Sequence, residues 1–254
     1  MNFFDIFRKS EQKAPQSTPE VESVQPDHNL SFDAEAVAKA RAAGKKCVFN
    51  LIIVDESGSM SSIYQQALTG MNETLQTIRE AEVENEGQAH FVTLVTFDTG
   101  HFNRIYNGSP AAKTTDLTEN QYRPCGGTPL FDAMGKSITD LRHKVMKEDL
   151  VLVTVITDGY ENASREYTCE AIKALVDQLR SQGWIFTYLG ANQDVEKVAM
   201  SMSINNYQGF EATQTGANDM FMREKRARKA FFSKAANCST DDLAEGDYFE
   251  GWDK

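Results

Sequence analysis

Five side chains whose oxygen atoms suit a hard cation occur in three separate stretches of the sequence. Asp55, Ser57 and Ser59 directly follow the apolar run CVFNLIIV, Thr128 lies in the turn CGGTP, and Asp158 follows the apolar run LVLVTVI. Two carboxylates and three hydroxyls would fill most of an octahedral shell. Such a set suits Mg²⁺ or Mn²⁺, and it suits Ca²⁺ less well because Ca²⁺ prefers more carboxylates and a larger cavity.

Apolar strands that alternate with helices are expected to position these residues. The helix that follows Ser164 is expected to bury Ala171, Leu175 and Leu179. Helices are also expected from Ser31 or Asp33 to Ala42, at 62–83, from a Thr128 cap onward, at 194–202 and at 217–236. Strands are expected at 47–54, 90–97, 102–106, 150–156, 184–189 and 207–212. This order predicts an α/β fold with a doubly wound, mainly parallel sheet and helices on both faces. The functional crevice of such a sheet lies beyond the carboxyl ends of its strands.

The D-x-S-x-S motif at 55–59, the distal Thr128 and the T-D-G motif at 157–159 resemble the metal-ion-dependent adhesion site of von Willebrand factor A domains. The resemblance spans residues 45–212. It implies a six-stranded sheet with an antiparallel edge strand near 102–106. It also implies that the two serines and Thr128 bind the metal directly, and that Asp55 and Asp158 bind it directly or through water. An acidic side chain of a partner protein would fill the remaining position. The segments TDGYENAS and LGANQD look like those of bacterial and phage intracellular members.

The expected function is therefore a metal-dependent protein-interaction module rather than an enzyme. The sequence has no G-x-x-x-x-G-K-[ST] loop and no G-x-G-x-x-G motif that opens a helix, and position 57 is Ser where a D-x-D motif would need Asp. A metal-dependent hydrolase or phosphotransferase stays open as an alternative. A structural or accessory subunit of a phage or stress-response assembly is another.

The amino-acid composition limits the kinds of molecule that the protein is expected to bind. The 254 residues include 37 Asp and Glu against 26 Lys and Arg, a net charge of -11, which disfavours a nucleic-acid binder. No apolar run is long enough to span a membrane, and no signal peptide is visible, so a cytoplasmic protein is expected. The cysteines are widely spaced and are expected to be reduced thiols.

Three parts are predicted along the chain. Residues 1–30 form a flexible segment whose apolar start could dock into a partner groove; its large apolar residues are Phe3, Phe4, Ile6 and Phe7. Residues 31–215 form the domain. Residues 216–254 form a basic helix and an acidic tail, and the tail could mediate self-association by docking into the metal site of another copy. The preferred interpretation of this last part is a solvated helix face and a loose tail.

Several residues near the predicted site are interpreted as structural. Glu56 and Glu161 could be taken for a catalytic acid and base, but we expect solvated residues at the rim. Cys125 is expected to be a loop residue, since a thiol is a poor Mg²⁺ ligand. The four histidines, which are His28, His90, His101 and His143, are expected to be ordinary strand and surface residues.

Overall fold

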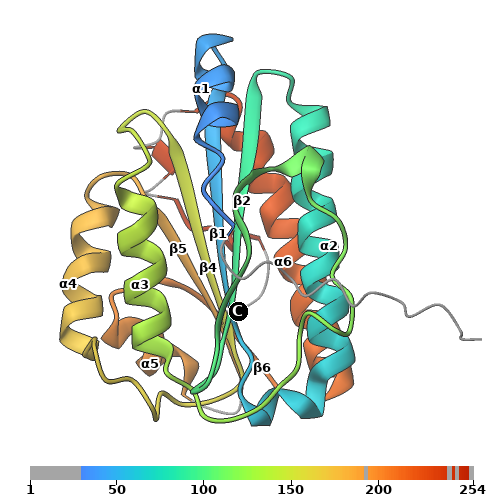
Figure 1. The fold of residues 1–254 in the computed structure, drawn as a ribbon, viewed down its shortest axis with the longest axis vertical. Helices are drawn as coiled ribbons and strands as arrows, with labels where there is room; N and C mark the ends of the chain where they lie inside the picture. The colour runs from blue at the N-terminus through green and yellow to red at the C-terminus, as the bar shows by residue number, and fades with distance from the viewer. Residues whose placement is uncertain (1–29, 192–193, 239–241, 244–245, 252–254) are drawn as a thin grey trace, which may run out of the picture.

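The computed structural model describes residues 30–191, 194–238, 242–243 and 246–251. The predicted docking segment at 1–9 lies outside the described residues. Six strands form one sheet in the order β3-β2-β1-β4-β5-β6 (Figure 1). The strands are β1 (Lys46–Asp55), β2 (Gln88–Phe97), β3 (Phe102–Pro110), β4 (Leu150–Thr157), β5 (Ile185–Ala191) and β6 (Asn206–Phe210). Only the β2–β3 pair is antiparallel.

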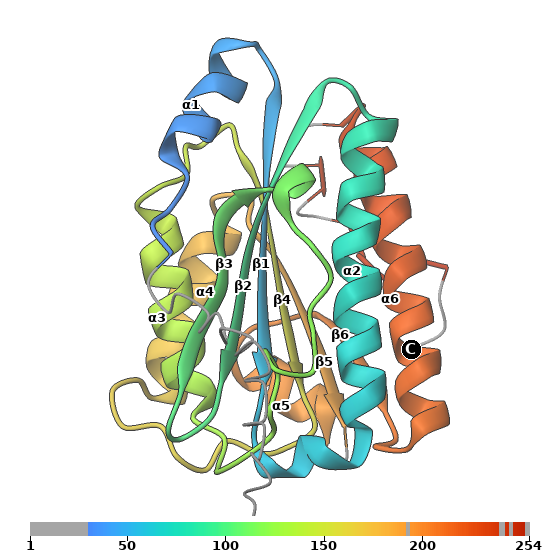
Figure 2. The same cartoon turned by 45° about the vertical axis from the view of Figure 1, so that its right-hand side comes forward.

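Helices cover both faces of this sheet. The helices are α1 (Ala34–Ala42), α2 (Tyr64–Glu84), α3 (Leu130–Arg142), α4 (Cys169–Arg180), α5 (Val195–Ser201) and α6 (Gln214–Ala235), with short 3₁₀ helices at Gly58–Ile63 and Ala111–Lys113. Helices α2 and α6 pack on one face, and α1, α3, α4 and α5 pack on the other (Figures 1 and 2). The predicted doubly wound α/β fold, including its antiparallel edge strand, is confirmed.

Strand β1 shows why helices cover both faces of the sheet. Val48 and Ile52 point into the core beneath α2 and α6, whereas Phe49, Leu51 and Ile53 point into the core beneath the other four helices. Successive side chains of a strand face opposite sides, so a continuous apolar run must be buried on both. In the part of the chain that the structure describes, no helix is long and apolar enough to cross a membrane.

Two helices begin later than the sequence predicts. Thr128 does not cap α3, because Pro129 occupies the N-cap position and the first helical residue is Leu130. The hydroxyl of Thr128 is thereby left for another role. Helix α4 begins at Cys169, with Thr168 as its cap rather than Ser164.

The buried face of α4 also differs from the prediction. The core residues are Ile172, Val176 and Leu179, whereas Ala171 is exposed and Leu175 is half-buried. The β-branched side chains of Ile172 and Val176, each one position further along the helix, fill the space beside the sheet, and only Leu179 was predicted correctly.

Helix α6 follows the predicted end of the domain at residue 215, yet it belongs to the same core as the sheet. Its Phe232 and the tail residues Leu243, Tyr248 and Phe249 are buried in the core that α2 and the sheet form. The interpretation of a solvated basic face is wrong for Arg228, which is fully buried. The interpretation of a loose tail is wrong for these three tail residues.

Two other basic side chains of α6 lie beside acidic residues of α2. Lys225 lies 3.9 Å from Glu73, and Lys229 lies 2.9 Å from Glu80. Helices α2 and α6 run side by side in both views (Figures 1 and 2). Part of the basic stretch of α6 is therefore paired with the acidic stretch of α2 within the fold.

Candidate metal site

The predicted metal ligands gather at the carboxyl edge of the sheet. Asp55 is the last residue of β1, and Asp158 directly follows β4. These two strands are adjacent, with Val54 opposite Ile156, and the strand order reverses between them. The loops that leave the two strands therefore meet where a doubly wound sheet places its binding crevice.

A chain of hydrogen bonds joins the two carboxylates. The backbone N–H of Ser57 donates to Asp55 Oδ1 at 2.7 Å, and the Ser57 and Ser59 hydroxyls are 3.1 Å apart. Ser59 Oγ donates to Asp158 Oδ1 at 2.6 Å. On the other side, Thr157 Oγ1 donates to Asp55 Oδ2 at 2.6 Å. Four of the five predicted residues are thus linked in one cluster.

Thr128 joins this cluster from the third loop. A Cβ atom built on Gly159 would lie 3.3 Å from Thr128 Oγ1, 3.4 Å from Ser59 Oγ and 3.8 Å from Asp55 Oδ2. Oxygens from three loops therefore surround one small space, which glycine at position 159 leaves free of a side chain. The backbone N–H of Gly58 donates to the carbonyl of Gly126 at 3.0 Å, and this bond holds two of the loops together.

The electrostatics of the cluster call for a cation. Asp55 is fully buried, and burial raises its pKa to about 6; hydrogen bonds from Thr157 and Ser57 oppose the rise, and the charge of Asp158 adds to it. Burial also raises the pKa of Asp158, against the hydrogen bond from Ser59. The Oδ2 atom of Asp158 is buried without a hydrogen-bond partner, and within the described ranges neither carboxylate has an ion pair. Buried carboxylates without a counter-charge are costly, so a divalent cation fits the donor set.

The chemical type of the candidate ligands also limits which metal ion could bind. Among the residues with a described position, no three His, Cys, Asp or Glu side chains gather as a metal-binding group. The candidate site instead combines two carboxylates with three hydroxyls, all hard oxygen donors. Such donors suit Mg²⁺ or Mn²⁺ and do not suit the soft metals that thiolates select.

The two glutamates near the site hold loops through hydrogen bonds. The prediction of solvated rim residues is wrong for Glu56, which is buried, whereas Glu161 is half-buried. Glu56 is 4% exposed, and its Oε1 accepts a hydrogen bond from the backbone N–H of Arg123. Glu161 accepts from the N–H of Phe131 at 3.0 Å and from the hydroxyl of Ser164 at 2.7 Å. Both carboxylates hold loops in place around the site, and neither is paired as a catalytic acid and base.

Other positioning residues gave no signal in the sequence. Asn162 Oδ1 accepts from the N–H of Thr128 at 2.9 Å, and Thr99 Oγ1 accepts from the N–H of Gly127 at 3.2 Å. The buried hydroxyl of Tyr122 donates to the carbonyl of Asp55 at 2.8 Å. All three act through the backbone of the ligand loops, so only the folded arrangement reveals them.

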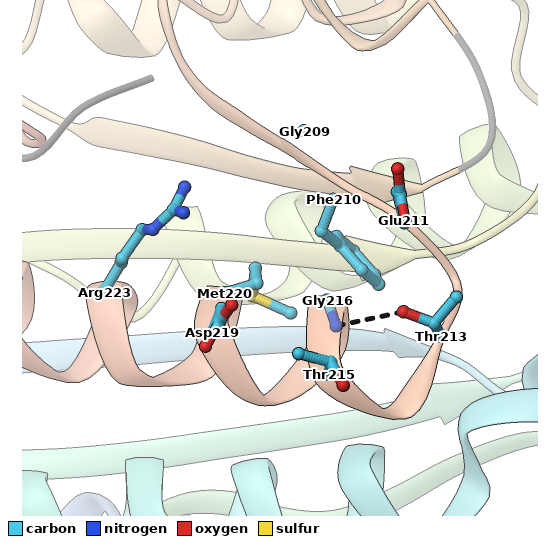
Figure 3. A pocket seen from close by; sticks show the side chains of 9 residues that line it. All are labelled: Gly209, Phe210, Glu211, Thr213, Thr215, Gly216, Asp219, Met220 and Arg223. Carbon is cyan, nitrogen blue, oxygen red and sulfur yellow. Dashed lines mark hydrogen bonds between the residues drawn. The ribbon is translucent and has the colours of Figure 1, made fainter.

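A cavity of about 450 Å³ at the end of β6 lies apart from this cluster (Figure 3). Residues from Gly209 to Arg223 line it, and none of the five candidate ligands is among them. The hydroxyl of Thr213 accepts a hydrogen bond from Gly216 N at 3.1 Å beside it, as Figure 3 shows, and so caps the start of α6. This cavity therefore reflects how α6 begins, and it adds nothing to the metal site.

Comparison with solved structures identifies the fold. The vWF domain of the type V pili tip protein Mfa5 from Porphyromonas gingivalis is 10% identical, with a TM-score of 0.51, over 72% of this chain and 95% of that domain. The chain has the von Willebrand factor A fold. An open conformation of the pilus adhesin SpaC from Lactobacillus rhamnosus GG matches this A domain with a TM-score of 0.53 and 14% identity, over 74% of this chain and 30% of SpaC.

The D319A mutant of the PilB minor pilin from Streptococcus sanguinis matches with a TM-score of 0.50 and 13% identity, over 75% of this chain and 63% of the pilin. The A domain therefore spans less than two thirds of the pilin and less than a third of SpaC. No model of a known protein family matches the sequence, and no curated protein is similar to it in sequence. At these identities the likeness concerns the fold.

Proposed function

We propose that this A domain is a metal-dependent protein-interaction module. It binds Mg²⁺ or Mn²⁺ through the five residues of the cluster, and a Glu or Asp side chain of a partner protein completes the coordination shell. The observation that carries this proposal is the pair of buried carboxylates, Asp55 and Asp158, which share a small space with three hydroxyls and make no ion pair with any basic side chain that the structure describes. The ligand set is Asp55, Ser57, Ser59, Thr128 and Asp158.

The chemistry of this site favours recognition. Three of its five ligands are neutral hydroxyls, and the two carboxylates formally balance the charge of a divalent cation. A partner carboxylate would therefore be drawn to the open coordination position, where it makes a charge-assisted contact with the cation. Hydrolysis would in addition need a free general base. Of the two nearby glutamates, Glu161 is held by loop hydrogen bonds; Glu56 is buried, its Oε1 accepts from the N–H of Arg123, and its Oε2 has no hydrogen-bond partner among the described residues. The named functions of the similar structures, a pilus tip protein, a pilus adhesin and a minor pilin, also support an interaction role.

Our predictions of where the module acts are based on the sequence alone. A cytoplasmic location, a bacterial or phage origin and self-association through the acidic tail stay predictions. A structural subunit that holds an assembly together without a metal is the competing function, and metal dependence separates the two.

The test combines metal binding with partner capture. Saturating Mg²⁺ at a hundred times its Kd should stabilise the wild-type protein by about 2.7 kcal/mol, read as a shift in thermal unfolding. Asp55→Ala should abolish this shift, and it should also release those partners that chelator removes in affinity purification. Asp116→Ala, at an exposed aspartate outside the cluster, is the matched control and should behave as wild type. Retention of both metal and partner by Asp55→Ala would sink the proposal.

A further inference from the structure

A cavity of about 590 Å³ adjoins the candidate metal site. The turn between β2 and β3, the start of α3 and the loop at 162–166 form its walls. Two of its lining residues also touch the loop that carries Thr128, since Thr99 accepts from the N–H of Gly127 and Asn162 accepts from the N–H of Thr128. The cavity and the candidate metal site therefore lie on either side of the same loop backbone.

The acidic side chains of the cavity already have partners. Asp98 accepts hydrogen bonds from the backbone N–H groups of Gly100 and His101. Asp132 accepts three, at 2.8 to 2.9 Å, from the N–H groups of residues 165–167. Glu166 pairs with Lys136 at 2.7 Å. Backbone donors thus hold Asp98 and Asp132, whereas Glu166 is exposed and has only the ion pair with Lys136 among the contacts of the described residues.

The basic side chains of the cavity have hydrogen-bond donors that are not used within the described part of the chain. The guanidinium of Arg165 is exposed and makes no hydrogen bond or ion pair within the described part of the chain. His101 Nδ1 lies 3.1 Å from Asp98 Oδ2, which leaves its other ring nitrogen open to solvent. The ammonium of Lys136 has two further N–H donors beyond its bond to Glu166. The free hydrogen-bonding capacity of this cavity is thus that of donors and positive charge.

We propose that this cavity binds a second carboxylate of the partner that supplies the metal-bound one, with Arg165 as its main contact. The inference rests on the proposed function, and it defines the partner as a segment with two acidic residues in close succession. Arg presents a planar fork that matches a carboxylate, so one guanidinium suffices for the contact. Binding at two linked points raises affinity because the second contact is made within the same complex.

End-capped synthetic peptides can test this with Mg²⁺-loaded protein. One peptide carries a single Glu among glycines, and the others carry two Glu separated by one, two or three glycines. At least one spacing should bind roughly five- to tenfold more tightly than the single-Glu peptide, as NMR titration would measure. Amide signals at 98–101 and 163–166 should shift only with the two-Glu peptides.

Two variants assign the effect to Arg165. Arg165→Gln should reduce the affinity for the best two-Glu peptide to that for the single-Glu peptide and should leave Mg²⁺ binding and single-Glu binding unchanged. Arg142→Gln, at the far end of α3, is the matched control and should keep the advantage. If the advantage survives in Arg165→Gln, or if no spacing gives one while the single-Glu peptide binds, the second site is refuted and the metal site stands. If no peptide binds in a Mg²⁺-dependent way, both proposals fall.

Discussion

Two clusters of buried charge on the same sheet differ in where their cation comes from. At the carboxyl edge, the described residues give Asp55 and Asp158 hydrogen bonds from hydroxyls and backbone N–H groups and no ion pair. Beneath α6, Glu224 is 2% exposed, and its Oε1 accepts from Arg228 Nε at 2.7 Å. Both clusters keep carboxylates out of water, but only the second contains its own positive charge.

The cluster beneath α6 ties the C-terminal part of the chain to the central strands. Arg228 donates to Thr154 Oγ1 of β4 at 2.8 Å and reaches Asn50 Oδ1 of β1 at 3.5 Å. The hydroxyl of Tyr248 donates to Glu224 Oε1 at 3.0 Å. A buried charge with an internal counter-ion thus serves structure, whereas one without it is available for a ligand.

Removing the internal cation should give the largest effect. Arg228→Met leaves Glu224 buried without a counter-charge, and we expect a loss of about 3 to 5 kcal/mol in the free energy of unfolding, measured with urea. Replacing both partners, with Arg228→Met and Glu224→Leu together, should recover much of this loss. Lys229→Met is the matched control on the same helix, because its ion pair with Glu80 is exposed and contributes about 0 to 1 kcal/mol. A loss as small as that of the control would contradict the distinction between the clusters.

A charge-neutralising substitution should have opposite consequences in the two clusters. In chelator, Asp158→Asn should be at least as stable as wild type, because it removes a buried charge that has no counter-ion. It should also lose the stabilisation of about 2.7 kcal/mol that metal at a hundred times its Kd gives to wild type. Glu224→Gln should instead destabilise the protein, because it leaves Arg228 without its partner. Thermal unfolding measures the stability of Asp158→Asn in chelator, its response to Mg²⁺ and the stability of Glu224→Gln. A metal-free Asp158→Asn protein less stable than wild type would count against the site.

A third buried titratable group, His90, extends the comparison to the pH dependence of stability. His90 on β2 is fully buried, and its Nε2 lies 2.8 Å from Gln88 Oε1. Burial, together with the positive charge of Arg228, lowers the pKa of His90 to about 3. The unfolded chain binds a proton near pH 6.5 that the folded protein does not, so the stabilising effect is present above that pH and is lost as pH falls toward 3.

At pH 5 we expect the lowered pKa of His90 to reduce the free energy of unfolding by about 2 kcal/mol relative to pH 7.5. The raised pKa of Asp55 acts with the opposite sign in metal-free protein. The measurement is therefore the difference in pH dependence between wild type and His90→Gln in chelator, because Asp55 contributes equally to both. Equal slopes in the two proteins would show that His90 takes up its proton in the folded state.

The metal cluster was predictable from the sequence because its signals are local. Asp55 ends one strongly apolar strand and Asp158 directly follows another, and parallel strands bring their carboxyl ends to one edge. Thr128 was found through its glycine turn, although its expected role as a helix cap was wrong. The family resemblance then supplied the pairing of the three loops. The structure places their side chains close together, and metal binding by them stays a prediction.

The cluster beneath α6 could not be predicted in this way. Glu224 and Arg228 are four residues apart on a helix, a spacing that is common on solvated surfaces. Their burial depends on Asn50 and Thr154, which lie far away in the sequence. The same holds for Glu56, whose carboxylate is buried only because the backbone of Arg123 folds back over it. Long-range contacts of this kind decide whether a charged residue is exposed, and no local pattern reports them.

The smallest predicted effect concerns the tail residue that completes the internal cluster. Tyr248→Phe removes one hydrogen bond to Glu224 while keeping the aromatic ring in the core, so we expect a loss of about 1 kcal/mol in unfolding free energy. Tyr106→Phe is a suitable control, because its hydroxyl donates to Thr115 at the surface. Tyr248→Phe should leave the Mg²⁺ affinity unchanged, since the internal cluster and the metal site are separate. A change in Mg²⁺ affinity would instead show that the two charge clusters of this sheet are coupled.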